Sequence, residues 1–243
     1  MIVANVRRQL RRDDAQLVLR LIARGSHAEY ERAEVTLRDQ GLDEVLDDPR
    51  LLPALVEARQ GACASYALFS YVVVRHALRG VGEQDRTLAD YVASVLLHFG
   101  LWDRAHRVAN ADDEWYMPLA ELSGAADGPD ARRTFLVRAH LGNYALWLSG
   151  LFPDHIASRH WRRGAPNLEY YEAMGRRGFT LAAEHDLADE HGVRTLFATA
   201  AERFPLLRLA LNRVSDAYLF PGHHSPDRLM REVSDAARWK LVS

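Results

Sequence analysis

Signals that begin and end α-helices recur along almost the whole chain, and no other feature constrains the fold as strongly. Ser26 and Glu29 form a capping-box pattern that opens one amphipathic segment. Ser225 followed by Pro226 is an N-cap with a proline in the first helical turn. The one serious strand candidate is 70–76, which is β-branched but lacks flanking turns and alternation. We therefore predict an all-α protein with no significant sheet.

Caps and helix breakers divide the sequence into about ten helices. They are expected over roughly 3–22, 27–40, 43–48, 50–79, 87–99, 102–122 (broken near Asn110), 130–152, 154–163, 168–190, 192–203, 206–219 and 226–241. The segments 50–79 and 130–152 are the most apolar. The sequence thus predicts a multi-helix bundle around one or two buried central helices, 50–79 and 130–152.

The chain has 243 residues, enough for one large domain or two small ones. The most turn-like region is 111–129, and a boundary inside the chain would fall there. We expect a single helical domain over 1–243. The alternative is an N-terminal helical half, 1–123, followed by a C-terminal half, 130–243.

Composition limits which cellular compartment and which kinds of partner are expected for this protein. The formal net charge of −2 argues against a globally basic nucleic-acid binder, although Lys240 is the only lysine among 31 basic residues and the others are arginines. The longest apolar run, 62–74, is shorter than the ~20 residues that a membrane span needs. The first residues contain no apolar signal-peptide region, and Cys63 is the single cysteine. We expect a cytoplasmic protein, with a homodimer or other homo-oligomer left open.

The segment 130–152 is apolar on every side, as expected of a helix surrounded by protein. Its polar residues fall on two sides. His140, Asn143, Tyr144 and Trp147 have the spacing i, i+3, i+4, i+7 and share one face. Arg138 lies on the other side, on a stripe whose remaining members, Gly142, Ala145 and Ser149, are small. We expect another backbone to approach this stripe closely and an acid, Glu169 or Glu172, to pair with Arg138.

The segment 153–178 follows the central helix and is rich in basic and aromatic side chains. If its helices pack back on 130–152, an inter-helix pocket can form around His140, Asn143 and Glu169, a common place for ligands in helical proteins. The candidate ligand-binding residues are Arg138, His140, Asn143, Tyr144, Trp147, His155, His160, Glu169, Tyr170 and Glu172. The same polar groups can instead satisfy one another and set the helix register.

Known catalytic and metal-binding patterns are missing from the sequence. It contains no Glu-x-x-His pair, no phosphate-binding glycine loop and no Gly-x-Ser-x-Gly. No metal site is expected and no cofactor is identified; the residues of suitable type are His140, His160 and Glu172.

Two functional hypotheses follow. The first is a non-catalytic protein that binds a small molecule or a protein partner. The alternative is a metal-assisted helical enzyme that uses His140, His155 or His160, and Glu169 or Glu172.

Overall fold

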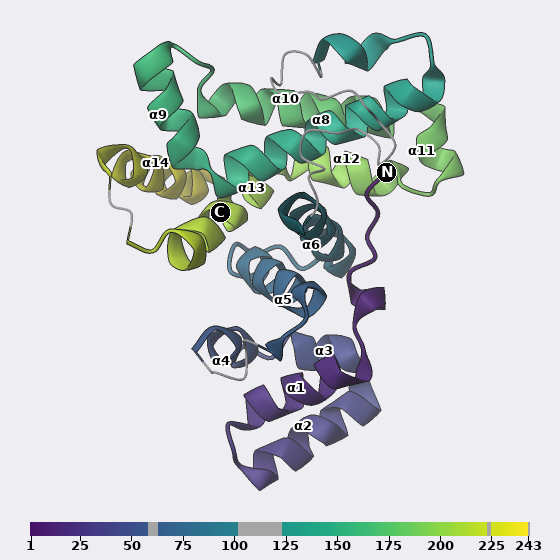
Figure 1. Ribbon diagram of the computed structural model, residues 1–243, viewed down its shortest axis with the longest axis vertical. Helices are drawn as coiled ribbons and strands as arrows, with labels where there is room; N and C mark the ends of the chain where they lie inside the picture. The colour runs from purple at the N-terminus through teal and green to yellow at the C-terminus, as the bar shows by residue number, and fades with distance from the viewer. Residues whose placement is uncertain (58–62, 102–122, 223–224, 243) are drawn as a thin grey trace. The chain divides into compact units, whose positions relative to one another are not determined.

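The computed structural model describes residues 1–57, 63–101, 123–222 and 225–242. These residues form thirteen α-helices, short 3-10 turns and one π-helix, with no strand among them (Figure 1). The prediction of an all-α, multi-helix bundle is therefore confirmed. The expected helix at 102–122 lies outside the described residues, as does most of the predicted boundary region 111–129. By its internal contacts the chain divides into two compact units, an N-terminal unit of residues 2–101 and a C-terminal unit whose described residues begin at 123.

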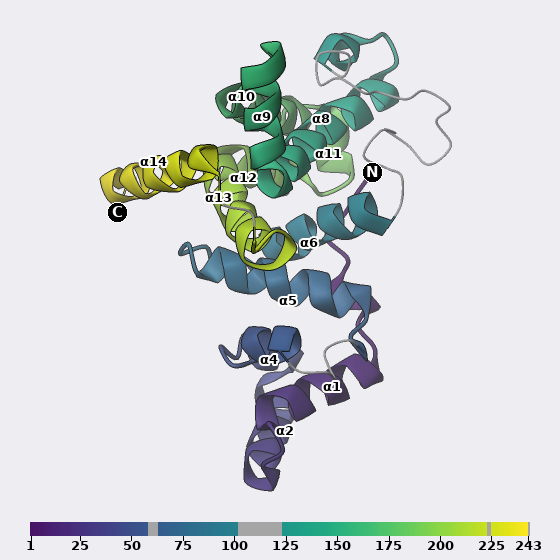
Figure 2. The same cartoon turned by 60° about the vertical axis from the view of Figure 1, so that its left-hand side comes forward.

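The N-terminal unit is built from six α-helices among its described residues. They are preceded by the 3-10 helix η1 (Arg7–Gln9) and comprise α1 (Arg12–Ala23), α2 (His27–Gln40), α3 (Leu42–Leu46), α4 (Leu51–Glu57), α5 (Tyr66–Arg79) and α6 (Arg86–Leu101). Helices α1 and α2 pack together, and α5 lies beside α6 (Figures 1 and 2). The core between α5 and α6 contains Leu68, Tyr71, Leu88 and Tyr91, all fully buried.

The single helix expected over 50–79 is interrupted. Helix α4 ends at Glu57, and Ser65 has an extended backbone (ψ 152°) directly before α5. The Ser65 side chain accepts a hydrogen bond from the backbone nitrogen of Leu68 at 3.0 Å, so it acts as an N-cap where the sequence had indicated a helix interior. Cys63, which falls within the range of that expected helix, is exposed.

Asp47, directly after α3, ties three helices of the N-terminal unit together. Arg75 of α5 contacts both of its carboxylate oxygens, at 2.7 and 2.8 Å, and Arg86 of α6 donates to it at 2.8 Å. Arg75 is only 2% exposed. Burial by itself would raise the pKa of Asp47, but the hydrogen bonds from Arg75 and Arg86 outweigh that effect and lower the pKa to about 2.

The C-terminal unit contains the longest of the described helices, which packs closely against a second helix. Its described elements are η4 (Ala125–Asp127), α8 (Ala131–Leu151), α9 (Pro153–Arg163), α10 (Leu168–Ala183), α11 (Asp186–Glu190), α12 (Arg194–Glu202), α13 (Phe204–Val214), the π-helix η5 (Ser215–Leu219) and α14 (Pro226–Val242). Helices α8 and α10 lie side by side in both ribbon views (Figures 1 and 2). The helix expected over 168–190 is divided at His185, whose extended backbone and ring nitrogen cap α11.

Helix α10 packs against the small-residue stripe of α8. The sequence predicted that another backbone would approach this stripe closely, and α10 supplies that backbone. A Cβ placed on Gly178 of α10 would lie only 2.6 Å from the backbone nitrogen of Gly142 and 2.9 Å from the carbonyl oxygen of Arg138. A Cβ on Gly142 would meet the ring of Phe179 at 2.5 Å. The two backbones can approach this closely because position 178 is glycine, and the ring of Phe179 fits against α8 because position 142 is glycine.

Acid titration is expected to weaken the N-terminal unit through Asp47. Because the pKa of Asp47 is lower in the folded than in the unfolded chain, its ion pairs stabilise the fold above about pH 4, and this contribution of about 2 kcal/mol is lost as the pH falls toward 2. The difference in free energy of unfolding between the wild type and Asp47→Asn should therefore narrow over that range in urea titrations. A constant difference would show that Asp47 does not titrate as described.

Replacement of Gly178 by alanine is expected to destabilise the C-terminal unit by about 3 kcal/mol, because the added methyl group meets backbone atoms that no side-chain rotation can move. The matched control is Gly100→Ala on α6, where a Cβ has no neighbour within 4 Å among the described residues and the free energy of unfolding should stay the same or rise slightly. Urea denaturation measures both. Equal stabilities of the two variants would contradict the close approach of α8 and α10.

Candidate functional site

Helix α8 is the central helix of the C-terminal unit and carries five of the residues singled out in the sequence, from Arg138 to Trp147. Asp130 caps it by accepting hydrogen bonds from the backbone nitrogens of Arg132 and Arg133, at 2.9 and 3.2 Å. His140 and Asn143 are 4% and 3% exposed, so this polar face is buried. The prediction that α8 is surrounded by protein is consistent with the burial of fourteen of its residues.

The face that begins at His140 continues as a row of aromatic rings. The His140 ring stacks near Tyr144 (centroids 6.3 Å apart, planes at 18°), and Tyr144 lies 6.1 Å from Trp147. Trp147 meets Phe152 edge-on at 5.0 Å, and Phe152 lies 6.1 Å from Phe220. Burial raises the pKa of Tyr144. The row runs from the buried middle of α8 to its carboxyl end, where the protein is hollowed.

Side chains of α13 and η5 cap the carboxyl end of α8. Pro153 starts α9 and has no N–H to donate back to α8. Asn212 instead donates to the carbonyl oxygens of Ser149 and Gly150, each at 2.8 Å, and Ser215 donates to Leu151 at 2.7 Å. Three of the last carbonyls of α8 are thus satisfied without continuing the helix, and the chain can turn into α9.

Arg208 anchors this end of the unit. Its guanidinium, 2% exposed, donates to Glu172 of α10 and to both carboxylate oxygens of Asp235 on α14, at 2.6 and 3.1 Å. It also donates to Asn212, which orients the amide that caps α8. A fully buried guanidinium with two carboxylates and an amide around it links three helices and is a structural group.

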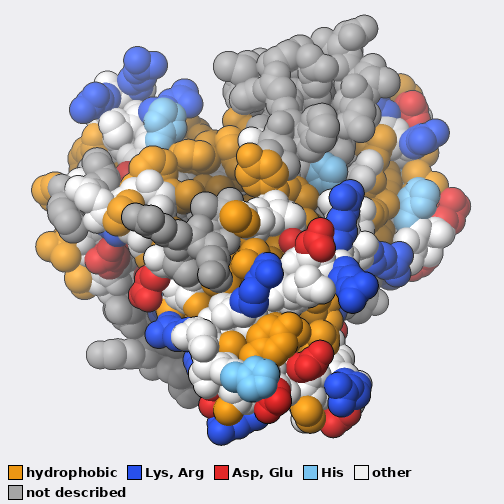
Figure 3. All heavy atoms as spheres, turned by 60° about the horizontal axis from the view of Figure 1, so that its bottom comes forward, with side chains coloured by type: hydrophobic (Ala, Val, Ile, Leu, Met, Phe, Trp, Pro, Cys, Tyr) orange, Lys and Arg blue, Asp and Glu red, His pale blue; other side chains and the backbone are white. Residues whose placement is uncertain are grey.

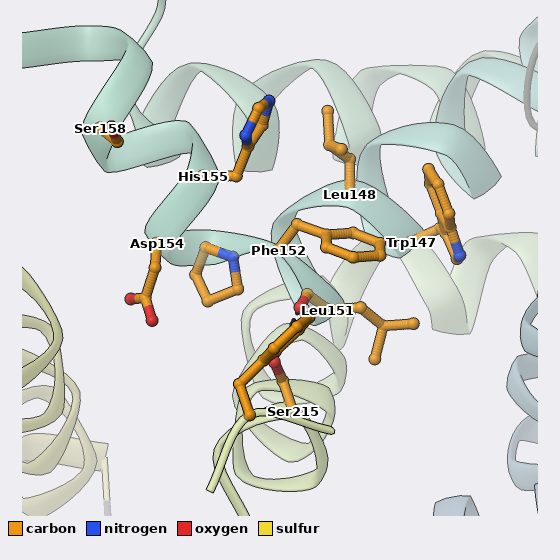
Figure 4. A pocket seen from close by; sticks show the side chains of 10 residues that line it. Trp147, Leu148, Leu151, Phe152, Asp154, His155, Ser158 and Ser215 are labelled. Atoms are coloured by element: carbon orange, nitrogen blue, oxygen red, sulfur yellow. Dashed lines mark hydrogen bonds between the residues drawn. The ribbon is translucent and has the colours of Figure 1, made fainter. Parts of the chain in front are cut away.

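An open cavity of about 600 Å³ lies where α8, α9 and η5 meet. Its lining consists of Trp147, Leu148, Leu151, Phe152, Pro153, Asp154, His155, Ser158, Ser215 and Phe220. Figure 4 shows the ring of Phe152 directed toward Trp147, with the His155 ring on the α9 side. Most of the lining is apolar, and its volume falls within the range of about 300–1,000 Å³ that small-molecule sites occupy.

The acidic group of this cavity is already neutralised. Asp154 points away from His155 in Figure 4 and accepts from Arg231 of α14 at 3.3 Å. Arg231 also contacts both oxygens of Asp216, at 3.0 and 3.2 Å. The Asp154 carboxylate is therefore part of the contact between α9 and α14, and the cavity itself remains apolar with two hydroxyl groups and an imidazole at its margin.

A second cavity of about 440 Å³ adjoins the first along α9. It is lined by His155, Ser158, Arg159, Arg162 and Arg163, and it shares His155 and Ser158 with the apolar cavity. Basic side chains gather around a histidine at one end of the face shown in Figure 3, at the upper left where α9 ends, next to apolar side chains. The cationic cavity and the apolar cavity thus form one continuous surface.

The sequence-predicted residues are distributed over several environments. Trp147 lines the apolar cavity, and His155 lines both cavities. His140, Asn143 and Tyr144 are buried along α8, deeper in the unit than the lining residues. The shared face predicted for His140, Asn143, Tyr144 and Trp147 therefore leads into the apolar cavity at its Trp147 end.

The remaining predicted residues lie outside the lining of both cavities. His160 is exposed, and its Nδ1 lies 2.6 Å from the carbonyl oxygen of Ala165. Tyr170 packs edge-on against Tyr171, with centroids 5.9 Å apart. Glu169 is exposed in the first turn of α10, and Glu172 is held by Arg208.

The antiparallel register of α8 and α10 separates the predicted partners. Arg138 lies opposite Leu181, and Gly142 lies opposite Gly178. At 1.5 Å per residue, Glu169 lies about 15 Å along α10 from the position that faces His140. The structure therefore does not bring Glu169 beside His140.

Arg138 pairs with a residue that the sequence did not indicate. Its guanidinium donates to Asp127 at 3.0 Å and to the carbonyl oxygen of Ala126 at 2.9 Å. The expected pairing with Glu169 or Glu172 is wrong, because the register places both acids at the opposite end of α8, near Ser149 and Gly150. Within the described ranges, no group of three histidine, cysteine or acidic side chains has the arrangement of a metal site.

The lining residues that sequence analysis missed are mainly apolar. Leu148, Leu151 and Phe152 were assigned to a general apolar surface of α8, and Ser215 and Phe220 were not singled out. The one usable signal was the aromatic-rich end of the segment before Pro221, which could not show that it faces α8.

In the part of the chain that the structure describes, no helix combines the length and the apolar character needed to cross a membrane. Comparisons with protein-family models, with curated proteins and with solved structures find no match for this chain. The two cavities are therefore the basis for proposing a function.

Replacement of Asn212 by leucine, which has a similar size but no donor, is expected to lower the free energy of unfolding of the C-terminal unit by about 2 kcal/mol or more. The change leaves the carbonyls of Ser149 and Gly150 without their donor and removes an acceptor from Arg208. Asn167→Leu, which removes only the exposed N-cap of α10, should cost about 1 kcal/mol. Urea denaturation compares the two, and an equal or smaller loss for Asn212→Leu would contradict the capping role.

Proposed function

We propose that this protein binds a small apolar ligand, without catalysing a reaction, in the cavity between α8, α9 and η5. The observation that carries the proposal is an open cavity of about 600 Å³ whose lining is mostly apolar and aromatic. Trp147, Phe152 and Phe220 supply flat apolar walls, and Ser158, Ser215 and His155 supply polar groups at its margin. A mostly apolar cavity with a few polar groups is the usual composition of a ligand site.

The hydrogen bonds and ion pairs that hold the walls of the cavity support this proposal. Asn212 and Ser215 fix the carboxyl end of α8, and Arg231 connects α9 to α14 through Asp154. The ligand would therefore enter a largely preformed cavity, so that little of its binding free energy would be lost in ordering the protein.

The residues of the rival hypothesis, a metal-assisted enzyme, are engaged elsewhere. Glu172 is held in the ion pairs of Arg208, and Glu169 is remote from His140 along α10. His155 lies at the margin of the cavity, but His160 interacts with the backbone of Ala165. These contacts favour binding over metal-assisted chemistry.

Octanol is a suitable first probe, because each buried CH₂ group contributes about 0.8 kcal/mol before the entropic cost of binding is subtracted. Calorimetric titration is expected to show saturable binding to the wild type. Leu148→Asp places a charge in the apolar wall and should weaken binding by about tenfold or more. Leu187→Asp makes the same change at a half-buried leucine of α11 outside the cavity lining and should leave the affinity unchanged.

Tryptophan fluorescence gives an independent readout. The chain has five tryptophans, and Trp147 lies in the cavity wall. Octanol should change the emission of the wild type, and Trp147→Phe should lose most of that change while still binding octanol in the calorimeter. The proposal fails if octanol does not bind, or if Leu148→Asp and Leu187→Asp affect binding equally.

A further inference from the structure

The cationic cavity on α9 extends the apolar cavity in a definite direction. His155, Ser158, Arg159 and Arg162 have the spacing i, i+3, i+4, i+7 and therefore share one face of the helix. His155 and Ser158 at the start of this face also line the apolar cavity. A molecule in the apolar cavity thus meets guanidinium groups where it passes Ser158.

The arginines of this face differ from the other arginines around the site. Arg208 and Arg231 each contact two carboxylates. Within the described residues, Arg159, Arg162 and Arg163 contact no carboxylate and donate to no backbone carbonyl. Three neighbouring cations without an acid partner on a concave surface provide a place where an anion is stabilised.

The position of these arginines at the end of a helix provides a partial explanation without a ligand. Cations near a helix carboxyl end are stabilised by the helix dipole by about 0.3–1 kcal/mol. That effect requires no cavity, however, and it does not account for Arg159, which lies a turn earlier and lines the cationic cavity. Burial raises the pKa of Tyr144 and of Tyr171, and the charge of Arg159 is close enough to offset part of that rise.

We infer that the ligand is a single-chain amphiphile whose apolar chain occupies the cavity of Trp147 and Phe152 and whose anionic head group binds Arg159, Arg162 and Arg163. The inference rests on the proposed function, since it assigns the chain to the same apolar cavity. Ser158 and Arg162 are four residues apart, or about 6 Å along α9. This separation fits a head group attached directly to the chain. Carboxylate, phosphate and sulfate head groups share the chemistry that guanidinium groups recognise.

The direct test compares ligands that share one chain and differ in charge. Octanoate, octanol and octylamine are titrated against the full-length protein by calorimetry, below the concentrations at which they form micelles. Octanoate is expected to bind about fivefold or more tightly than octanol, and octylamine more weakly than octanol, because exposed ion pairs each contribute up to about 1 kcal/mol. The advantage of octanoate should shrink in high salt, whereas the affinity for octanol should not fall.

A matched pair of double variants assigns the effect to α9. Arg162→Gln/Arg163→Gln should remove most of the preference for octanoate and leave octanol binding unchanged. Arg176→Gln/Arg177→Gln removes the same charge from two exposed neighbours on α10 and should leave both affinities unchanged. Octyl phosphate and octyl sulfate, titrated in the same way, distinguish which head group binds most tightly.

The outcomes separate this inference from the proposed function. Equal affinity for octanoate and octanol would overturn the inference and leave the apolar site standing. Absence of binding by all three ligands would overturn both. Octanoate binding that is insensitive to Leu148→Asp would show an anion site that does not use the cavity. Co-sedimentation with anionic phosphatidylserine vesicles, but no binding of monomeric octanoate, would overturn the inference in favour of a membrane surface, for which the 75% exposed Trp161 beside the arginines would be the contact.

Discussion

The rest of the C-terminal unit depends on the close contact of the α8 and α10 backbones. At Gly178 no side chain separates the helices, and a single methyl group there would overlap backbone atoms of α8, while the ring of Phe179 packs on Gly142 beside it. A contact without side chains to adapt permits little sliding or rotation, so it sets both the register and the orientation of α8. One side of α8 is committed to α10, and the row from His140 to Trp147 consequently leads toward α9.

The cavity exists because α8 ends where its last carbonyls are satisfied by another helix. Helices α13 and η5 carry buried polar residues whose burial would be unfavourable without hydrogen-bond partners. Asn212 and Ser215 donate to α8, and Arg208 orients Asn212 while it holds Glu172 and Asp235. These contacts let the chain turn at Pro153 without leaving buried backbone groups unpaired. The divergence of α9 from the line of α8 then leaves a space that Phe152 and Phe220 fill only in part.

The electrostatic character of the site comes from which arginines have acid partners. Arg231 neutralises Asp154 at the base of α9, so the apolar cavity carries no uncompensated negative charge. Further along the same helix, Arg159, Arg162 and Arg163 line a cavity without acids. An apolar space that continues into a cationic one is complementary to a molecule with an apolar body and an anionic end.

The sequence by itself determined the all-α class, most helix ends with recognisable caps, the buried face of His140 and the small stripe that receives α10. These properties depend on residues close in the chain, where helical periodicity and capping act. The sequence did not predict the interruption before Ser65, because this N-cap lies within an apolar run. Only the tertiary structure decided that Arg138 binds Asp127, that Arg208 binds Glu172, and that a cavity opens beside Trp147. Periodicity assigns a residue to a side of its helix, but the partner on that side is set by the axial register between helices, which here depends on two glycines far apart in the sequence.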